Sequence, residues 1–203
     1  MKEFWDERYS ETDYAYGTKP NNFFKQTLKK MQLTGKALFP AEGEGRNAVY
    51  AAKKKLEVTA FDMSIEGKKK ALQLAVNNNV TIDYKVGTFD EFNFKENSFD
   101  IIVLIFVHLP CGLNEIYFKK LASYLKPNGY IIAEVFSKNH LQFSSINPLA
   151  GGPKNIDMLF TVDDFKNFYP NFKIIKLNQT TIDLNEGLYH KGKASVIRFI
   201  GKK

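Results

Sequence analysis

The sequence predicts an α/β fold built on a parallel sheet. From Lys36 to Phe136, short apolar runs alternate with amphipathic segments, which is the pattern of βαβ units. The run "IIVLIFV" (101–107) is apolar without a break, as is typical of a central strand buried on both faces. The stretch "KPNG" (126–129) then ends a helix and turns into the next strand.

The elements follow in order along the chain. An N-terminal helix within 19–35 is expected to bury Phe23, Phe24, Leu28 and Met31. The expected strands are Lys36–Ala41, Leu56–Phe61, Val80–Val86, Ile101–Val107 and Tyr130–Phe136. Two helices between them show apolar residues at helical spacing, at Ile65, Leu72, Ala75 and Val76, and at Leu113, Ile116, Tyr117, Leu121, Tyr124 and Leu125.

The C-terminal third has a different pattern. Thr161 and Asp164 form a capping-box pattern for a short helix that Pro170 ends. Phe172–Leu184 and Leu188–Ile200 are expected to form a hairpin joined by "NEG". The long segment Ser137–Phe160 contains Gly151-Gly152-Pro153, and loops of this length are usually functional or disordered.

Length and composition bound the class of protein. The 203 residues suit one α/β domain, and we expect a soluble, cytoplasmic protein because no signal peptide or long apolar run is present. The single cysteine and the three scattered histidines predict no metal site and no disulfide framework. The net charge of +7 raises the question of nucleic acid, but the lysine runs lie in expected surface helices without interleaved aromatic residues. We therefore interpret them as a solvated surface, so a nucleic-acid partner is not expected.

A glycine-rich loop follows the first strand. "GEGRNA" supplies Gly43, Gly45 and Ala48 in a G-x-G-x-x-A pattern, and Asp62 lies 19 positions after Gly43 at the end of the second strand. This arrangement binds adenosine cofactors, with the acid on the ribose hydroxyls. Asp62 could instead cap the helix that starts near Ser64, and the glycines could form an ordinary tight turn.

Two carboxylates favour a cofactor without phosphate. Glu42 and Glu44 bracket Gly43, and they would repel a pyrophosphate at the helix N-terminus. S-adenosylmethionine carries an ammonium and a sulfonium, for which carboxylates are favourable neighbours. No lysine follows in the form of a P-loop. The motif thus indicates S-adenosylmethionine.

At this point the chain resembles the class I S-adenosylmethionine-dependent methyltransferases, and most closely the tellurite-resistance and thiopurine methyltransferase-like group. The resemblance rests on "FWDERY…YAYGTKPNNF", "AEGEGRNAVYAA", "VTAFDMS", "FDIIVLIFVHLP" and "LKPNGYIIAE", in family order, with the late "GGP" and "GLYHKGKA". It implies a Rossmann-like, seven-stranded, mostly parallel sheet with helices on both faces and an antiparallel C-terminal hairpin. It also implies a single domain with a lid and helix at 1–35, a cofactor-binding core at 36–136 and a substrate-side segment at 137–203.

The resemblance also assigns site residues. Those expected to bind the cofactor are Trp5, Tyr16, Ala41, Glu42, Gly43, Gly45, Asn47, Asp62, Met63, Thr88, Phe89 and Ile105. Those expected to contact the acceptor are Phe106, His108, Tyr189 and His190. The chain departs from the family pattern at Phe39 and Ala41, where an acid and a glycine are usual, and at Thr88, where an acid often contacts the adenine.

The residues after the fourth strand should face the transferred methyl group. They are apolar apart from His108, which is expected either as a base and substrate orienter or as a packed histidine bonded to the backbone. The [ND]PP[YF] motif of base-N-methylating enzymes is absent here. Pro110-Cys111 has the form of a cytosine-C5 nucleophile motif, but Cys111 is interpreted as the start of the helix that follows.

The sequence thus predicts an enzyme that transfers a methyl group from S-adenosylmethionine to a small molecule. A thiol or another soft chalcogen is the expected acceptor. The alternatives are an NAD-dependent oxidoreductase, an RNA-directed methyltransferase and a non-catalytic cofactor-binding protein. The oligomeric state stays open at this point.

Overall fold

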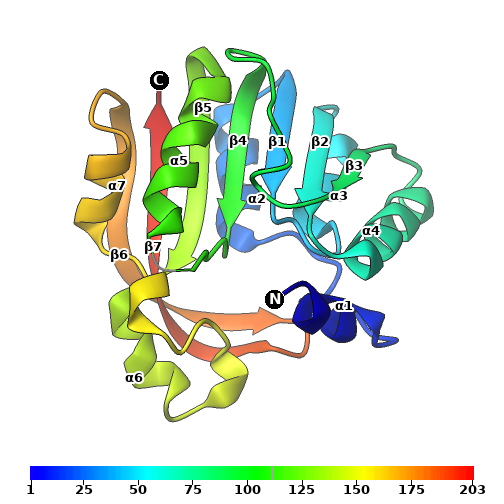
Figure 1. The fold of residues 1–203 in the computed structure, drawn as a ribbon, viewed down its shortest axis with the longest axis vertical. Coiled ribbons are helices and arrows are strands. Elements are labelled where there is room, and N and C mark those ends of the chain that lie inside the picture. The colour runs from blue at the N-terminus through cyan, green and yellow to red at the C-terminus, as the bar shows by residue number, and fades with distance from the viewer. Residues whose placement is uncertain (111) are drawn as a thin grey trace.

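A mixed sheet of seven strands runs through the molecule, in the order β3-β2-β1-β4-β5-β7-β6 (Figure 1). The computed structural model describes residues 1–110 and 112–203. The strands are β1 (Lys36–Pro40), β2 (Glu57–Asp62), β3 (Asp83–Val86), β4 (Phe99–Ile105), β5 (Leu125–Phe136), β6 (Lys173–Glu186) and β7 (His190–Lys202). The first five pair in parallel, and β7 pairs antiparallel with both β5 and β6. The expected fold class and the C-terminal hairpin are therefore confirmed.

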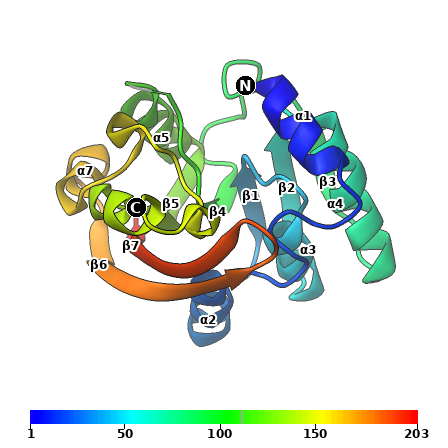
Figure 2. The ribbon, with the colours of Figure 1, turned by 90° about the horizontal axis from the view of Figure 1, so that it is seen from below.

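Helices cover both faces of the sheet (Figure 2). The α-helices are α1 (Lys2–Ser10), α2 (Asn22–Met31), α3 (Arg46–Lys53), α4 (Ile65–Asn77), α5 (Leu113–Tyr124), α6 (Leu141–Ser144) and α7 (Val162–Phe168). Short 3₁₀ turns, η1 (Lys138–His140), η2 (Pro148–Ala150) and η3 (Ile156–Met158), lie with α6 in the long segment expected as a loop. Among the helices of the described residues, none combines the length and the hydropathy needed to cross a membrane.

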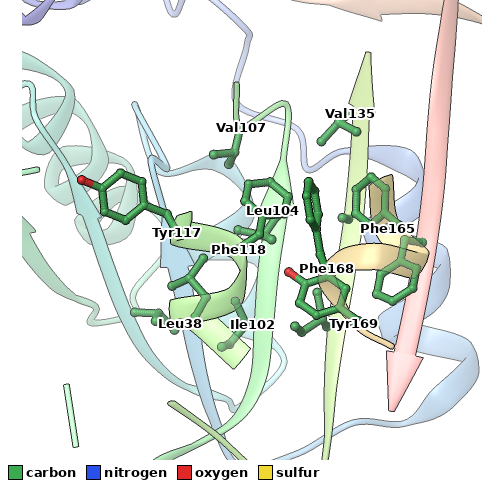
Figure 3. Close-up of a cluster of buried hydrophobic side chains, with 14 of the residues drawn as sticks. Leu38, Ile102, Leu104, Val107, Tyr117, Phe118, Val135, Phe165, Phe168 and Tyr169 are labelled. Carbon is green, nitrogen blue, oxygen red and sulfur yellow. The ribbon is translucent and has the colours of Figure 1, made fainter. Parts of the chain in front are cut away.

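Two hydrophobic clusters hold the helices to the sheet. On one face, α5 and α7 pack an aromatic-rich layer on β1, β4 and β5, where Phe118 and Phe165 are fully buried beside Leu104 (Figure 3). On the other face, Phe24 of α2 meets Phe39 of β1 edge to face at 5.7 Å, and the alanines of α3 pack nearby. Burial of these apolar side chains is the main force that fixes the sheet between its helices.

The turn at "KPNG" falls inside β5. Pairing with β4 jumps from Phe99–Leu125 to Ile101–Tyr130, so residues 126–129 leave the ladder and Asn128 adopts a φ of 67°. The regular ladder begins again at Tyr130, as the sequence predicted. The hairpin turn lies slightly later than expected, because β6 continues to Glu186.

The structure corrects two helix predictions. In α4, Ile65, Leu72 and Val76 are exposed, and the buried face consists of Gly67, Ala71, Leu74 and Ala75. Small side chains face inward there because α3 and α1 both pack closely against this helix. In α5, Ile116 is exposed as well.

Helix α1 was not expected as a helix. It lies beyond the carboxyl ends of β1 and β2, near the tip of the β6–β7 hairpin, as seen in both ribbon views. The N-terminal segment binds this tip through the backbone, since Leu188 donates to the carbonyl of Ala15 at 2.8 Å. Gly17 and Gly187 meet so closely that a Cβ on Gly187 would lie 2.4 Å from the Gly17 nitrogen.

Candidate functional site

A cavity of about 360 Å³ opens at the carboxyl ends of β1, β2 and β4, where open α/β sheets bind ligands. Helix α1 forms one wall, the loops after the three strands form the floor, and residues 152–154 with His190 form the far wall. The predicted site residues that line it are Trp5, Tyr16, Ala41, Glu42, Asn47, Asp62, Met63, Thr88, Phe89, Ile105, Phe106, His108 and His190. The topology therefore brings together most of the residues that the sequence singled out.

Gly43, Gly45 and Tyr189 do not line the cavity, and the two glycines are required by packing. Gly43 has a φ of 62°, and a Cβ there would lie 2.6 Å from the hydroxyl of Tyr9. Gly45 has a φ of 83°, and its Cβ would lie 2.5 Å from that of Ala71 in α4. Side chains disfavour such φ values, so both positions need glycine for the backbone turn and for close helix approach. Tyr189 lies beside the site, with the Arg8 guanidinium 4.2 Å above its ring.

Glu42 fills the N-terminus of α3. Its Oε1 accepts hydrogen bonds from the backbone N–H groups of Asn47 at 2.7 Å and Ala48 at 2.8 Å. Burial raises its pKa to about 7, although these two bonds act in the opposite direction. The N–H groups that a pyrophosphate would need at a helix N-terminus are therefore engaged by a carboxylate of the protein itself.

Asp62 joins the first two loops. Its Oδ2 accepts from the N–H of Gly43 at 3.0 Å, and its Oδ1 accepts from the N–H of Ser64 at 2.9 Å. Burial raises its pKa to about 6 against the effect of these bonds. The helix cap that Asp62 could have supplied is provided by Ser64, which accepts from the N–H of Gly67.

Glu44 does not take part in the cavity. Its Oε1 pairs with Lys70 of α4 at 2.9 Å, and its Oε2 is buried without a partner among the described residues. The charge argument against a pyrophosphate thus depends on Glu42 and Asp62, and not on Glu44. The local sequence gives no sign of this, because Lys70 lies one helix away.

Thr88 is held by a neighbouring acid. Its N–H donates to Oε2 of Glu91 at 2.6 Å, and its hydroxyl donates to the same atom at 3.1 Å. Phe89, by contrast, is nearly buried and packs edge to face on Phe61 at 5.1 Å. The wall at 87–89 therefore offers apolar surface more than free hydrogen-bonding groups.

His108 is fixed by two backbone groups. Its Nε2 accepts from the N–H of Phe136 at 3.1 Å, and its Nδ1 bonds the carbonyl of Met158 at 2.8 Å. Burial lowers its pKa to about 4, despite the bond to Met158. Because both ring nitrogens bond the backbone, this geometry favours the packed histidine over the base and substrate orienter, the two roles that the sequence left open.

Cys111 lies outside the described residues, so the choice between a nucleophile and a helix start is not tested. Among the residues that the structure does describe, no group of three or more His, Cys, Asp or Glu side chains could hold a metal ion.

Several cavity-lining residues were not expected from the sequence. Met1 and Phe4 line the cavity with Trp5, Arg8 and Tyr9 of the expected N-terminal lid, and the spacing of three or four residues among them was a helical signal. Arg46, the first residue of α3, also lines the cavity, and its guanidinium pairs with Glu186 at 2.8 Å. No local pattern could reveal this pair, because its members belong to distant segments of the chain.

The residues present fit S-adenosylmethionine. Glu42 and Asp62 can accept hydrogen bonds from hydroxyl and ammonium groups, and apolar surface from Phe61, Met63 and Phe89 lies beside them. When bound, this cofactor supplies an electrophilic methyl group on a sulfonium. The acidic lining and the occupied helix N-terminus match such a cation better than a pyrophosphate.

Comparisons with known proteins agree with this fit. Residues 40–129 match the family model described as "Methyltransferase domain". No curated protein matches the sequence.

Solved structures share the fold at low identity. A protein from work on the "Conversion of a Disulfide Bond into a Thioacetal Group during Echinomycin Biosynthesis" has a TM-score of 0.81 at 14% identity, over 100% of this chain and 91% of its own. TehB from Haemophilus influenzae has a TM-score of 0.69 at 16% identity, over 100% of this chain and 66% of its own. A SAM-dependent methyltransferase from Methanosarcina mazei has a TM-score of 0.63 at 19% identity, over 83% of this chain and 92% of its own.

These likenesses concern the fold alone, and the family match adds the activity. The match to a methyltransferase domain covers residues 40–129, and the chain is a methyltransferase enzyme whose cofactor is S-adenosylmethionine.

Proposed function

We propose that this enzyme methylates a small molecule at a thiol or another soft chalcogen atom, and that it is related to the tellurite-resistance and thiopurine methyltransferase-like group. The observation that carries the proposal is one continuous cavity lined by the carboxylates of Glu42 and Asp62 and by many aromatic and apolar groups.

The cofactor end is proposed to comprise Ala41, Glu42, Asn47, Asp62, Met63, Thr88, Phe89 and Ile105. Trp5 and Tyr16 would cover it as part of an N-terminal lid. Trp5 stacks on Tyr9 at 5.3 Å, so the aromatic faces of α1 are already ordered. Aromatic faces near a sulfonium add cation–π attraction.

The acceptor end is proposed to lie among Phe106, His108, Phe136, Met158 and His190. Phe106 and Phe136 stack at 4.6 Å, and His108 stacks on the same Phe136 ring at 5.5 Å. Such an apolar wall suits a soft nucleophile, because methyl transfer then depends mainly on in-line placement and exclusion of water. The structural relative from work on a thioacetal group is in keeping with sulfur chemistry on this fold.

The test is a screen for production of S-adenosylhomocysteine by the purified protein supplied with S-adenosylmethionine. The acceptors are 2-mercaptoethanol, a thiophenol, selenite and tellurite, with total RNA as the alternative substrate. We expect turnover with at least one sulfur, selenium or tellurium compound and none with RNA. Turnover with RNA alone would contradict the proposal and support the RNA-directed alternative.

A further inference from the structure

His190 lines the cavity and has a carboxylate partner, Glu186, which His108 and His140 lack. Its ring is 5% exposed and lies between Tyr16, at a centroid distance of 4.4 Å, and Phe106, at 4.6 Å. The Nδ1 atom lies 3.3 Å from Oε2 of Glu186, four residues earlier across the hairpin turn. The packing therefore fixes the plane of the imidazole, and the carboxylate fixes its rotation.

Glu186 is held in its ionised form by the groups around it. Its Oε2 pairs with the permanently charged Arg46 at 2.8 Å, and its Oε1 accepts from Nδ2 of Asn21 at 3.2 Å. Burial alone would raise its pKa, but the bond to His190 and the charge of Arg46 lower it to about 2.

The charge on Glu186 sets the tautomer of His190. An ionised carboxylate can only accept a hydrogen bond, so the proton of the neutral imidazole sits on Nδ1. Nε2 then carries the free lone pair, and no hydrogen bond to it is found among residues 1–110 and 112–203. It lies near Gly151, the residue before the lining residues 152–154, since a Cβ on Gly151 would lie 3.2 Å from it.

The other two histidines lack this arrangement. Both nitrogens of His108 bond backbone groups. His140 bonds the carbonyl of Gly151 through Nε2 at 2.9 Å and does not line the cavity. Of the three, only His190 lines the cavity and combines a carboxylate partner with a ring nitrogen that has no hydrogen bond among the described residues.

We infer that His190 is the general base of this enzyme, oriented by Glu186, and that it removes the proton from the acceptor's nucleophilic atom at Nε2. The inference rests on the proposed function and narrows it. The acceptor is a thiol or another protonated nucleophile, and not a chalcogen oxyanion such as selenite or tellurite, which has no such proton to lose.

In the proposed reaction, one proton moves to His190 and one methyl group moves to the acceptor. The proton of the acceptor's S–H passes to Nε2, the electron pair left on sulfur forms the bond to the methyl carbon, and the sulfonium sulfur keeps the pair of the bond that breaks. The imidazolium so formed is stabilised by Glu186 and later returns its proton to water.

Burial is the main cause that keeps the His190 ring neutral before the reaction. Burial lowers the pKa of His190, and the Arg46 charge acts in the same direction, while Glu186 opposes them. The groups that face the ring are Glu186 on β6, Arg46 on α3, Tyr16 on the N-terminal segment, His140 on η1 and His108 after β4. A neutral ring is the form that can accept a proton at neutral pH.

The test compares the wild type with His190→Asn, which keeps an N–H donor near Glu186 but has no basic nitrogen. The acceptors are 2-mercaptoethanol, which is mostly protonated at pH 7, and 4-nitrothiophenol, which is already ionised. We expect His190→Asn to lose kcat with 2-mercaptoethanol by about 100-fold or more, and by less than about fivefold with 4-nitrothiophenol. Equal losses with both thiols would overturn the inference.

A second readout needs no acceptor. A long-range ¹H–¹⁵N NMR spectrum of the protein alone, with the His190 signals identified by their loss in His190→Asn, reports the tautomer. Protonated Nδ1 with bare Nε2 is expected, and Glu186→Gln should abolish that preference. A proton on Nε2 would overturn the inference. Titration with S-adenosylhomocysteine separates the two proposals. If the wild type does not bind it, the proposed function fails. If the wild type and His190→Asn bind it equally, cofactor binding is intact and only the role of His190 as the base is being tested.

Discussion

Arg46 and Glu186 are 140 positions apart in the sequence and form an ion pair of 2.8 Å. Arg46 begins α3 directly after the glycine-rich loop, and Glu186 is the last residue of β6. Asn21 extends the contact, since its Nδ2 donates to Glu186 and to Glu134 on β5. The pair thus connects the cofactor-binding loop to the hairpin that carries His190.

Arg46→Gln should lower the free energy of unfolding by about 3 kcal/mol, because it leaves the carboxylate of Glu186 without its cation in a largely buried place. Urea unfolding measures this loss. The matched control is Lys119→Gln, which breaks an exposed pair with Glu115 of 2.6 Å on α5 and should cost less than about 0.5 kcal/mol. Equal losses in the free energy of unfolding would contradict the claim that burial makes the Arg46–Glu186 pair more important than an exposed pair.

The affinity for S-adenosylhomocysteine should rise with pH between about 5 and 7.5 and then level off. The pKa of Asp62 is raised to about 6 and that of Glu42 to about 7, so both are partly protonated below neutrality, and only the carboxylate forms can bind an ammonium or accept from hydroxyls freely. The slope should approach tenfold per pH unit for each group, measured by calorimetry at several pH values.

The control for this pH dependence is Asp62→Asn, which should remove the part of the slope near pH 6. The same raised pKa values make the ligand-free protein less stable as the pH rises from about 4 to 7, because the folded state there binds more protons than the unfolded chain. A pH-independent affinity would mean that neither carboxylate contacts the ligand.

Gly45→Ala should destabilise the protein by more than Gly112→Ala. Both glycines have similar φ values, 83° and 80°, so the backbone strain of about 1–2 kcal/mol is common to them. A Cβ at position 45 also meets Ala71 at 2.5 Å, whereas none of the described residues beyond the chain neighbours lies within 4 Å of one at position 112. Thermal or urea unfolding of the two variants isolates the packing contribution; equal losses would show that α4 moves aside without cost.

His108 should not titrate between pH 5 and 8, because its pKa is lowered to about 4 by burial. The pH–rate profile of His108→Asn should therefore keep the wild-type shape, while turnover falls as Phe136 and Met158 lose their common anchor. NMR titration of the ring and the pH–rate profile check both parts. A profile that loses its acidic limb, the fall in rate at low pH, in this variant would return His108 to the role of base.

Most of the sheet could be predicted from the sequence because its signals are local. The unbroken run 101–107 predicted a central strand, although β4 starts and ends two residues earlier. Capping chemistry was equally local, and the predicted box at Thr161 is present with both of its bonds. The face of α4 was predicted wrongly because its buried side is made of small residues, which carry little hydrophobic signal.

The candidate site also has a part that could be predicted from the sequence and a part that could not. Glu42 and Asp62 belong to contiguous motifs, so their place in the cavity could be expected from the sequence. The ion pair of Arg46 with Glu186 depends on a contact between distant segments, and so does the pairing of Glu44 with Lys70. No spacing in the sequence encodes such contacts.

The most direct test of the central claim is isothermal titration of the purified protein with S-adenosylhomocysteine, with NAD in parallel. The account predicts saturable binding of S-adenosylhomocysteine at one site, weakened by Asp62→Ala, and no binding of NAD, because the N–H groups of Asn47 and Ala48 are already bonded to Glu42. Binding of NAD with no binding of S-adenosylhomocysteine would contradict it.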